Sequence, residues 1–139
     1  MNRFYSAPTC SPTRASMLTG INSLANGVIR PYANPRTESY GMPLYHKIMP
    51  EFLLEAGYQT ALSGKWHLGM SSDEYLPSSR GFQQTYGHMN GGIDYYDHSF
   101  SGRLDWHRDN IPLVEEGYAT NLIADLSLIH ISEPTRRYA

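Results

Sequence analysis

Residues 50–66 constrain the fold of this chain more strongly than any other segment. A helix is predicted over residues 50–57, because proline suits the first helical position and glycine suits the position after the last turn. One face of this helix carries Phe52, Leu53 and Ala56. The sequence YQTALSGKW, residues 58–66, follows directly and is predicted to be a buried strand that enters a turn. A helix that passes through a short glycine turn into a strand is half of a βαβ unit, which predicts an α/β fold.

The rest of the chain contains two further predicted helices separated by long irregular segments. Residues 12–19 begin with proline and are followed by Gly20, which predicts a helix over this range. Residues 21–47 are rich in Asn-Gly, Asn-Pro and isolated proline and glycine residues, so a long loop is expected there. Residues 71–118 are predicted to form loops and short strands, and another helix is expected to open over residues 120–126.

The composition is that of one globular domain, or of a piece of a larger one. The 139 residues are 40% hydrophobic and 17% charged, which is unlike the composition of a disordered chain. A net charge of -2 provides no basic surface for nucleic acid or anionic lipid, and no apolar run approaches the roughly 20 residues of a membrane span. We therefore expect no nucleic-acid partner and no membrane association. The single cysteine excludes a disulfide framework within these residues and a cysteine-rich zinc site.

That cysteine lies at a position suited to anion binding. In SAPTCSPTRASMLTG, residues 6–20, Cys10 stands just outside the N-terminus of the helix predicted over residues 12–19. Free backbone N–H groups and the helix dipole favour an anion there, and Arg14 adds a positive charge. Cys10 is therefore placed to meet an anionic substrate or to act as a reactive thiolate, and the alternative is a buried structural cysteine beside a helix cap. Tyrosine phosphatases also pair cysteine with arginine at a helix N-terminus, but their spacing is longer than the one seen here.

Two short motifs and a downstream block resemble the type I sulfatases. CSPTR, with the ASMLTG that follows it, resembles the family signature Cys-x-Pro-x-Arg, and GKWHLG at residues 64–69 resembles the second signature. The blocks RGFQQTYGHMNGGIDYYDHS and DWHRDNIPLVEEGYATNLIAD are similar in order and spacing to the arylsulfatase B-like branch. The resemblance covers roughly residues 3–126, and its two signatures occur in the family's order.

The resemblance implies an α/β chain that carries part of the alkaline-phosphatase-like sulfatase fold, a mostly parallel sheet flanked by helices that is incomplete here. Residues 1–126 would form a partial sulfatase catalytic domain. Residues 127–139, SLIHISEPTRRYA, do not continue the family pattern, and they resemble the translated sequencing-adapter tail found at the ends of fragmentary predicted proteins. We therefore expect residues 127–139 to be a non-native tail, and a divergent helix end with a polar tail is the alternative.

The resemblance also implies a chemical change at Cys10. A formylglycine-generating maturation enzyme would read Cys10, Pro12 and Arg14 in the unfolded chain and oxidise the cysteine to formylglycine, an aldehyde. The hydrate of this aldehyde carries two hydroxyls on one carbon, so that one attacks the sulfur of a sulfate ester and the second allows sulfate to be expelled. Arg14 would hold the hydrate and offset its charge. The oxidised Cys10 would also ligate a divalent cation, usually calcium, which prefers oxygen ligands.

Residues 64–69 add two candidate groups to the same site. In an extended backbone Lys65 and His67 point to one side and Trp66 points to the other, where it can pack into the core. A surface lysine and an ordinary hydrogen-bonded histidine beside a glycine turn would give the same sequence. By resemblance, Lys65 would contact both sulfate and formylglycine, and His67 would hydrogen-bond to the formylglycine hydroxyl and assist the elimination step.

Residues 88–109 contain polar and aromatic groups for which a packing role is expected. The histidines and aspartates are His88, His98, His107, Asp94, Asp97, Asp105 and Asp109. No pair of them has a recognised ligand spacing, so a metal cluster is disfavoured. Tyr95, Tyr96 and Trp106 would line a sugar-facing rim under a second interpretation.

The family's other active-site residues are not found in this sequence. The resemblance places an acidic pair well ahead of the cysteine motif, and further metal and sulfate ligands in a half that follows residue 126. We therefore expect a fragment that is inactive alone, taken from an exported enzyme that cleaves sulfate esters of small molecules or glycans. The alternatives are a sulfatase-like binding protein without turnover, and a hydrolase that uses Cys10 as a thiol nucleophile on phosphate esters.

Overall fold

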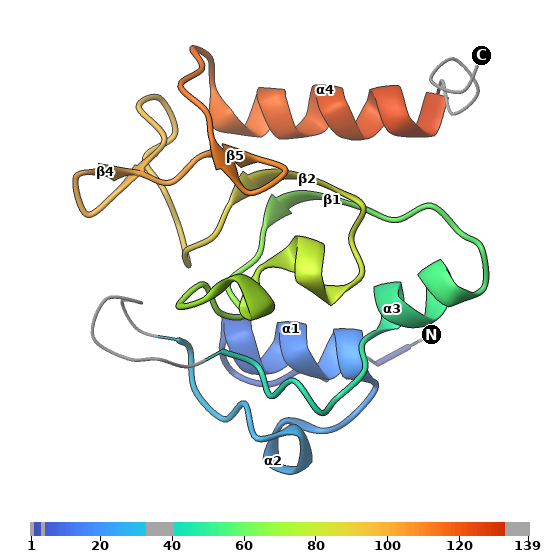
Figure 1. The fold of residues 1–139 in the computed structure, drawn as a ribbon. Coiled ribbons are helices and arrows are strands. Elements are labelled where there is room, and N and C mark those ends of the chain that lie inside the picture. The colour runs from blue at the N-terminus through green and yellow to red at the C-terminus, as the bar shows by residue number, and fades with distance from the viewer. Residues whose placement is uncertain (1, 4, 33–40, 133–139) are drawn as a thin grey trace.

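A computed structural model describes residues 2, 3, 5–32 and 41–132, and arranges them in layers with a small sheet between helices (Figure 1). The helices are α1 (Cys10–Thr19), α2 (Ser23–Asn26), α3 (Met49–Glu55) and α4 (Ala119–Ser132), and two 3₁₀ turns are η1 (Asp73–Tyr75) and η2 (Pro77–Arg80). The strands are β1 (Ala61–Lys65), β2 (Gln84–His88), β3 (Ser99–Phe100), β4 (Arg103–Leu104), β5 (His107–Arg108) and β6 (Ile111–Pro112). Figure 1 shows α1 on one side of β1 and β2, and α4 on the other. Part of the loop expected over residues 21–47, residues 33–40, lies outside the described residues.

The main sheet of the described residues has the order β1-β2-β5-β6 and is mixed. Strands β1 and β2 run parallel with Lys65 opposite His88, whereas β5 and β6 pair in antiparallel fashion. The α/β class is therefore confirmed, with antiparallel strands added beside the parallel pair. Because β1 lies at the edge of this sheet, only Gly64 within it is fully buried, and the prediction of a buried strand holds only in part.

Helix α1 begins two residues earlier than the sequence predicts. The N–H of Thr13 donates to the carbonyl of Thr9 at 3.2 Å, so the first turn already includes Cys10. Pro12 fits inside this turn because the first backbone N–H groups of a helix have no intrahelical acceptor. The helix ends as predicted at Gly20, whose φ of 70° is the left-handed conformation that glycine adopts readily. Cys10 is consequently the first residue of the helix.

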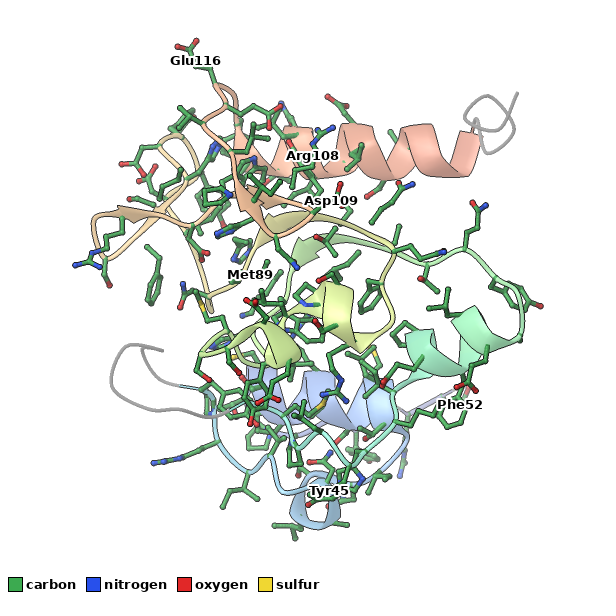
Figure 2. All side chains as sticks on the ribbon, viewed as in Figure 1. Tyr45, Phe52, Met89, Arg108, Asp109 and Glu116 are labelled. Carbon is green, nitrogen blue, oxygen red and sulfur yellow. The ribbon has the colours of Figure 1, made fainter. Side chains whose placement is uncertain are left out.

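The apolar residues of α3 do not form a buried face. Phe52 is 55% exposed and lies at the outer surface of the molecule, as Figure 2 shows. The ammonium of Lys47 lies 4.6 Å from the centre of the Phe52 ring, a cation–π contact on the solvent side. The helix is anchored instead at its start, where Pro50 is buried and the Glu51 carboxylate accepts a hydrogen bond from the Ile48 N–H at 2.7 Å.

Helix α4 begins at Ala119 and continues to Ser132 without a break at residue 126. The helix predicted to open over residues 120–126 is thus present and longer. The change from family sequence to tail at residue 127 remains a prediction. No helix in the part of the chain that the structure describes has the length and apolar character needed to cross a bilayer.

Two hydrophobic clusters lie on either side of the sheet. The larger one joins α1 and the loops to the sheet and includes Ala15, Leu18, Val28, Met42, Ile48, Trp66, Leu68, Phe82 and Met89. The smaller one joins the sheet to α4 and includes Tyr86, Trp106 and Ala119. The larger cluster fixes α1 against the segment that follows β1, and the predicted site residues lie at that junction.

Candidate active site

Cys10 and His67 meet at the N-terminus of α1. The Cys10 Sγ lies 3.1 Å from the His67 Nδ1, although 57 positions separate the two residues in the chain. The Cys10 side chain is half-buried and its thiol is free. It stands where the unpaired N–H groups and the positive end of the helix dipole face outward, which favours an anionic group. The structure therefore brings together the two signatures that the sequence singled out.

Arg14 fastens α1 to the end of β1. Its Nε donates a hydrogen bond to the carbonyl oxygen of Trp66 at 2.6 Å, and its Nη2 donates to the carbonyl oxygen of Lys65. Burial lowers the pKa of Arg14, and the proximity of Cys10 opposes that shift. Arginine stays protonated under such conditions, so a positive charge remains beside Cys10. Pro12, two residues before Arg14, is buried in the same helical turn.

Lys65 and His67 converge on Gly91, but not by way of an extended backbone. His67 has a φ of 54°, in the left-handed region, so the prediction of a continuous extended segment is wrong at this residue. The Lys65 Nζ donates to the Gly91 carbonyl oxygen at 2.6 Å, and the His67 ring packs on Gly91 so closely that a Cβ there would lie 2.8 Å from the His67 Cε1. Trp66 is 1% exposed and packs into the core, as the sequence predicts.

The hydrogen bonds of His67 define its neutral tautomer. Its Nε2 lies 3.1 Å from the carbonyl oxygen of Tyr32, which can only accept, so Nε2 carries the proton. Burial is the main cause that lowers the pKa of His67; the Tyr32 carbonyl opposes the shift, and the charges of Lys65 and Arg14 add to it. A neutral ring with a protonated Nε2 has its lone pair on Nδ1. That lone pair faces Cys10.

Ser11 is a member of the site that sequence reasoning missed. Its side chain is fully buried, and its Oγ donates to the His67 carbonyl oxygen at 2.8 Å and lies 3.3 Å from the His67 Nδ1. The same oxygen accepts a hydrogen bond from the Tyr32 N–H at 3.3 Å. These bonds hold the left-handed residue His67 against α1. Nothing in the pattern Cys-x-Pro-x-Arg marks the variable position after the cysteine for such a role.

The site combines a half-buried sulfur with positive charge and a proton acceptor. Arg14 and Lys65 both lie near enough to His67 to disfavour its protonation. A neutral imidazole that contacts the Cys10 Sγ at a helix N-terminus, with the charges of Arg14 and Lys65 near that imidazole, suits a substrate whose reacting group is an oxyanion. The arrangement can bind such a group, and it can accept a proton from a hydroxyl at residue 10.

The described residues offer little support for a calcium site beside Cys10. They contain no group of three or more His, Cys, Asp or Glu side chains placed to hold a metal ion. The Cys10 Sγ contacts the His67 imidazole, and Arg14 places positive charge nearby, whereas calcium requires several oxygen ligands. The nearby carboxylate of Asp105 is already hydrogen-bonded to Met89 and Asn90. Only Cys10, as an oxidised residue, remains a candidate ligand among these groups.

His88, His98 and the aromatic residues of this segment have structural contacts. The His88 Nδ1 donates to the Asn90 carbonyl oxygen at 3.0 Å. The His98 Nε2 lies 3.0 Å from the Gly117 carbonyl oxygen, and the His98 ring stacks on Trp106, which is fully buried and so cannot line a rim. The exposed rings are Tyr95 and Tyr96, which pack on Tyr118.

Comparison with known proteins matches this chain to sulfatases. The sulfatase family model matches residues 1–135. Arylsulfatase J of Mus musculus is 35% identical over 98 residues, which is 70% of this chain and 16% of that protein. Arylsulfatase G of Rattus norvegicus is 49% identical over 81 residues, 58% of this chain and 15% of that protein. N-acetylgalactosamine-6-sulfatase of Rattus norvegicus is 35% identical over 113 residues, 76% of this chain and 21% of that protein. The chain thus spans between 15% and 21% of the length of these relatives.

Solved structures share the same fold. The structure of Ps i-CgsB superposes with a TM-score of 0.80 at 23% identity, over 94% of this chain and 32% of that one, and supports the fold alone. The structure of BT4656 in complex with its substrate D-glucosamine-2-N,6-O-disulfate has a TM-score of 0.66 at 30% identity, over 95% of this chain and 23% of that one. With the family model covering residues 1–135 of 139 and both signatures meeting at Cys10, the chain belongs to the type I sulfatase family.

Proposed function

We propose that this chain belongs to an enzyme that hydrolyses sulfate esters, with Cys10 at the centre of the reaction. The observation that carries the proposal is the 3.1 Å contact between Cys10 Sγ and His67 Nδ1 at the N-terminus of α1. The cysteine lies within an intact Cys-x-Pro-x-Arg sequence, Arg14 supplies positive charge beside it, and Lys65 supplies positive charge beside its partner His67. Because the chain spans a small part of its relatives, this activity is assigned to a full-length enzyme, meaning a protein of the relatives' length that carries this chain.

The proposal includes oxidation of Cys10 to formylglycine by a maturation enzyme that reads Cys10, Pro12 and Arg14. As a hydrate, the aldehyde supplies two hydroxyls on one carbon, which suits both transfer and release of sulfate. The Cys10 thiol forms no disulfide in the structure, which leaves it available for this change. The group on residue 10 meets the lone pair of His67 Nδ1, while the Tyr32 carbonyl keeps the proton on Nε2. His67 is thus oriented to accept a proton from a hydroxyl at residue 10.

Lys65 would bind the sulfate group, and Arg14 would offset negative charge at the hydrate of residue 10. The Lys65 ammonium has three N–H donors and gives one of them to the Gly91 carbonyl, so the others are able to meet sulfate oxygens. Arg14 gives N–H groups to two backbone carbonyls and therefore acts mainly through its charge and by holding the backbone of residues 65–66 in place. Positive groups fixed before the reaction stabilise negative charge that develops on the sulfate.

Calcium, the substrate and the location of the enzyme complete the proposal. An oxygen on residue 10 would be one calcium ligand, and the others would come from outside the described residues. A sulfated small molecule or glycan is the proposed substrate, which the sulfated glucosamine bound by BT4656 supports. An exported enzyme is proposed on the basis of family membership alone.

Lys65→Ala and His67→Ala are expected to lower kcat for an aryl sulfate by ~10²-fold or more each, as lost electrostatic or proton-transfer groups do. The measurement is steady-state kinetics of the full-length enzyme carrying each change. Lys47→Ala is the matched control, because Lys47 is the other lysine of this chain and pairs at the surface with Glu55. An unchanged kcat for Lys65→Ala, or an equal loss for Lys47→Ala, would contradict the assignment of Lys65.

A further inference from the structure

We infer that Asp105 is a positioning residue of this active site, whose buried carboxylate holds the turn at residues 89–91 against Lys65 and His67. The expected effect of Asp105 on turnover rests on the proposed function, whereas its role in placing the turn rests only on its hydrogen bonds to Met89 and Asn90. Asp105 belongs to the DWHRD segment of the sequence, for which no metal-ligand spacing was found and to which the proposed reaction gives no role.

The Asp105 carboxylate is directed at the backbone of this turn. Asp105 is 3% exposed, and its Oδ1 accepts a hydrogen bond from the Met89 N–H at 3.1 Å. Its Oδ2 accepts from the Asn90 N–H at 2.8 Å and from the Asn90 Nδ2 at 3.0 Å. A carboxylate that is nearly removed from water needs such donors, and three of them on adjacent groups fix the turn firmly. The His107 Nδ1, 3.6 Å away, is too distant to be a further hydrogen-bond donor.

The same turn supports both candidate residues at the end of β1, Lys65 within the strand and His67 just after it. The His67 N–H donates to the Met89 carbonyl oxygen at 3.0 Å, and the Lys65 Nζ donates to the Gly91 carbonyl oxygen at 2.6 Å. Gly91 also packs directly on the His67 ring, which leaves no room for a Cβ. A displacement of the turn therefore moves the ammonium of Lys65 and the imidazole of His67 together. Catalytic groups lose much of their effect when they are misplaced even slightly.

Asp109 offers a comparison within the same molecule, at an exposed position where its carboxylate accepts one backbone hydrogen bond. Asp105 precedes β5 and Asp109 follows it; the Asp105 carboxylate accepts backbone hydrogen bonds from residues just after β2, and the Asp109 carboxylate accepts one from Thr85 near the start of β2. The Asp109 Oδ1 accepts from the Thr85 N–H at 2.8 Å, and the Asp109 N–H donates to the Thr85 carbonyl at 2.9 Å. Figure 2 shows Met89 on the side of the strands toward α1 and Asp109 on the side toward α4. Of these two positions, only Asp105 contacts the turn after β2 that meets Lys65 and His67.

The test compares Asp105→Asn with Asp109→Asn in the full-length enzyme. Each change removes a carboxylate that accepts backbone hydrogen bonds, and each is isosteric. The first readout is labelling of lysine by an amine-reactive acetylating reagent, with the peptides of Lys65 and Lys47 quantified by mass spectrometry. Asp105→Asn is expected to raise the Lys65 to Lys47 labelling ratio several-fold, because Lys65 loses its fixed contact with Gly91. Asp109→Asn is expected to leave that ratio unchanged.

The second readout is turnover of an aryl sulfate at a temperature where both variants are folded. Asp105→Asn is expected to lower kcat and kcat/KM together by about 10- to 100-fold, as misplaced catalytic groups do, and Asp109→Asn is expected to retain both. Asn90→Ala provides a milder variant in case Asp105→Asn does not fold. It removes only the Asn90 Nδ2 bond to Asp105, and a smaller change of the same kind is expected in both readouts.

The outcomes separate this inference from the proposed function. If the wild-type enzyme hydrolyses no sulfate ester, the proposed function fails, and the labelling ratio alone decides whether Asp105 places the turn. A labelling ratio that does not respond to Asp105→Asn or Asn90→Ala would overturn the inference. Equal losses of kcat for Asp105→Asn and Asp109→Asn would also overturn it, since they would indicate a general effect of destabilising the sheet.

Discussion

Cys10→Ala is expected to abolish sulfate ester hydrolysis by the full-length enzyme, with a loss in kcat of about 10⁴-fold or more, as removal of a covalent nucleophile causes. Under the proposed function residue 10 would supply the reacting atom, and the hydroxyl of the adjacent Ser11 is not able to replace it. The Ser11 side chain is fully buried, and its hydroxyl proton is given to the His67 carbonyl oxygen. The measurement is the release of an aryl alcohol or of sulfate under saturating substrate.

A neighbouring substitution controls for disturbance of the helix N-terminus. Thr9 precedes α1, is exposed, and makes no side-chain capping hydrogen bond, so Thr9→Ala is expected to leave kcat unchanged. Cys10→Ala removes one half-buried sulfur whose contact is with His67, and it should change the free energy of unfolding little. Turnover by Cys10→Ala close to that of the wild type would exclude residue 10 from the reaction.

Trp66→Ala is expected to lower the free energy of unfolding by about 3–5 kcal/mol, the usual cost of removing a large buried aromatic side chain. Trp66 is 1% exposed and meets the Phe82 ring edge to face at 6.1 Å. Its indole Nε1 donates to the carbonyl oxygens of Gly69 at 2.9 Å and Tyr75 at 3.0 Å. The substitution would leave a cavity in the larger hydrophobic cluster and two buried carbonyl groups without this donor.

Urea unfolding of the wild type and the variant measures this loss. Tyr58→Ala is a suitable control because Tyr58 is 62% exposed, and its free energy of unfolding should stay within about 0.5 kcal/mol of the wild-type value. A second comparison uses kcat, which Trp66→Ala should affect less than Lys65→Ala does while the protein is folded. If Trp66→Ala reduced turnover without reducing stability, the division between a core residue and an active-site residue would be incorrect.

The sequence predicted the class of the fold and the residues around Cys10, because both depend on short local sequence patterns. Pro12 lies in the first turn of α1 and Gly20 follows its last residue, and the Cys-x-Pro-x-Arg and Gly-Lys-Trp-His sequences contain the candidate residues themselves. The contribution of Ser11 was not visible, since it acts through hydrogen bonds to the backbone of a residue distant in sequence. The roles of Gly91 and Asp105 could not be predicted for the same reason. The Gly91 carbonyl accepts from a lysine ammonium and the Asp105 carboxylate accepts from backbone amides, and no spacing rule identifies such pairs.

The left-handed backbone conformation of His67 is a further feature that the alternation of side chains along a strand did not predict. Alternation along a strand predicted Lys65 and His67 on one side, yet His67 has left the extended conformation. The two side chains still meet at Gly91 because the turn after β2 reaches across both of them. The exposed face of α3 differs from expectation too, since an apolar pattern alone does not say whether a partner surface is present in the described residues.

The chemical state of residue 10 tests the central claim most directly. A chain or peptide bearing residues 6–20 would be expressed with a formylglycine-generating enzyme and digested with trypsin, and the mass of the fragment ending at Arg14 would be measured. We expect an aldehyde at Cys10 that forms an oxime with a hydroxylamine reagent and resists alkylation by iodoacetamide. Pro12→Ala should reduce the conversion, and Thr13→Ala, at a variable position of the signature, should not. Recovery of alkylatable thiol alone, beside a known substrate that converts fully, would contradict the claim and favour a cysteine that acts as a thiol.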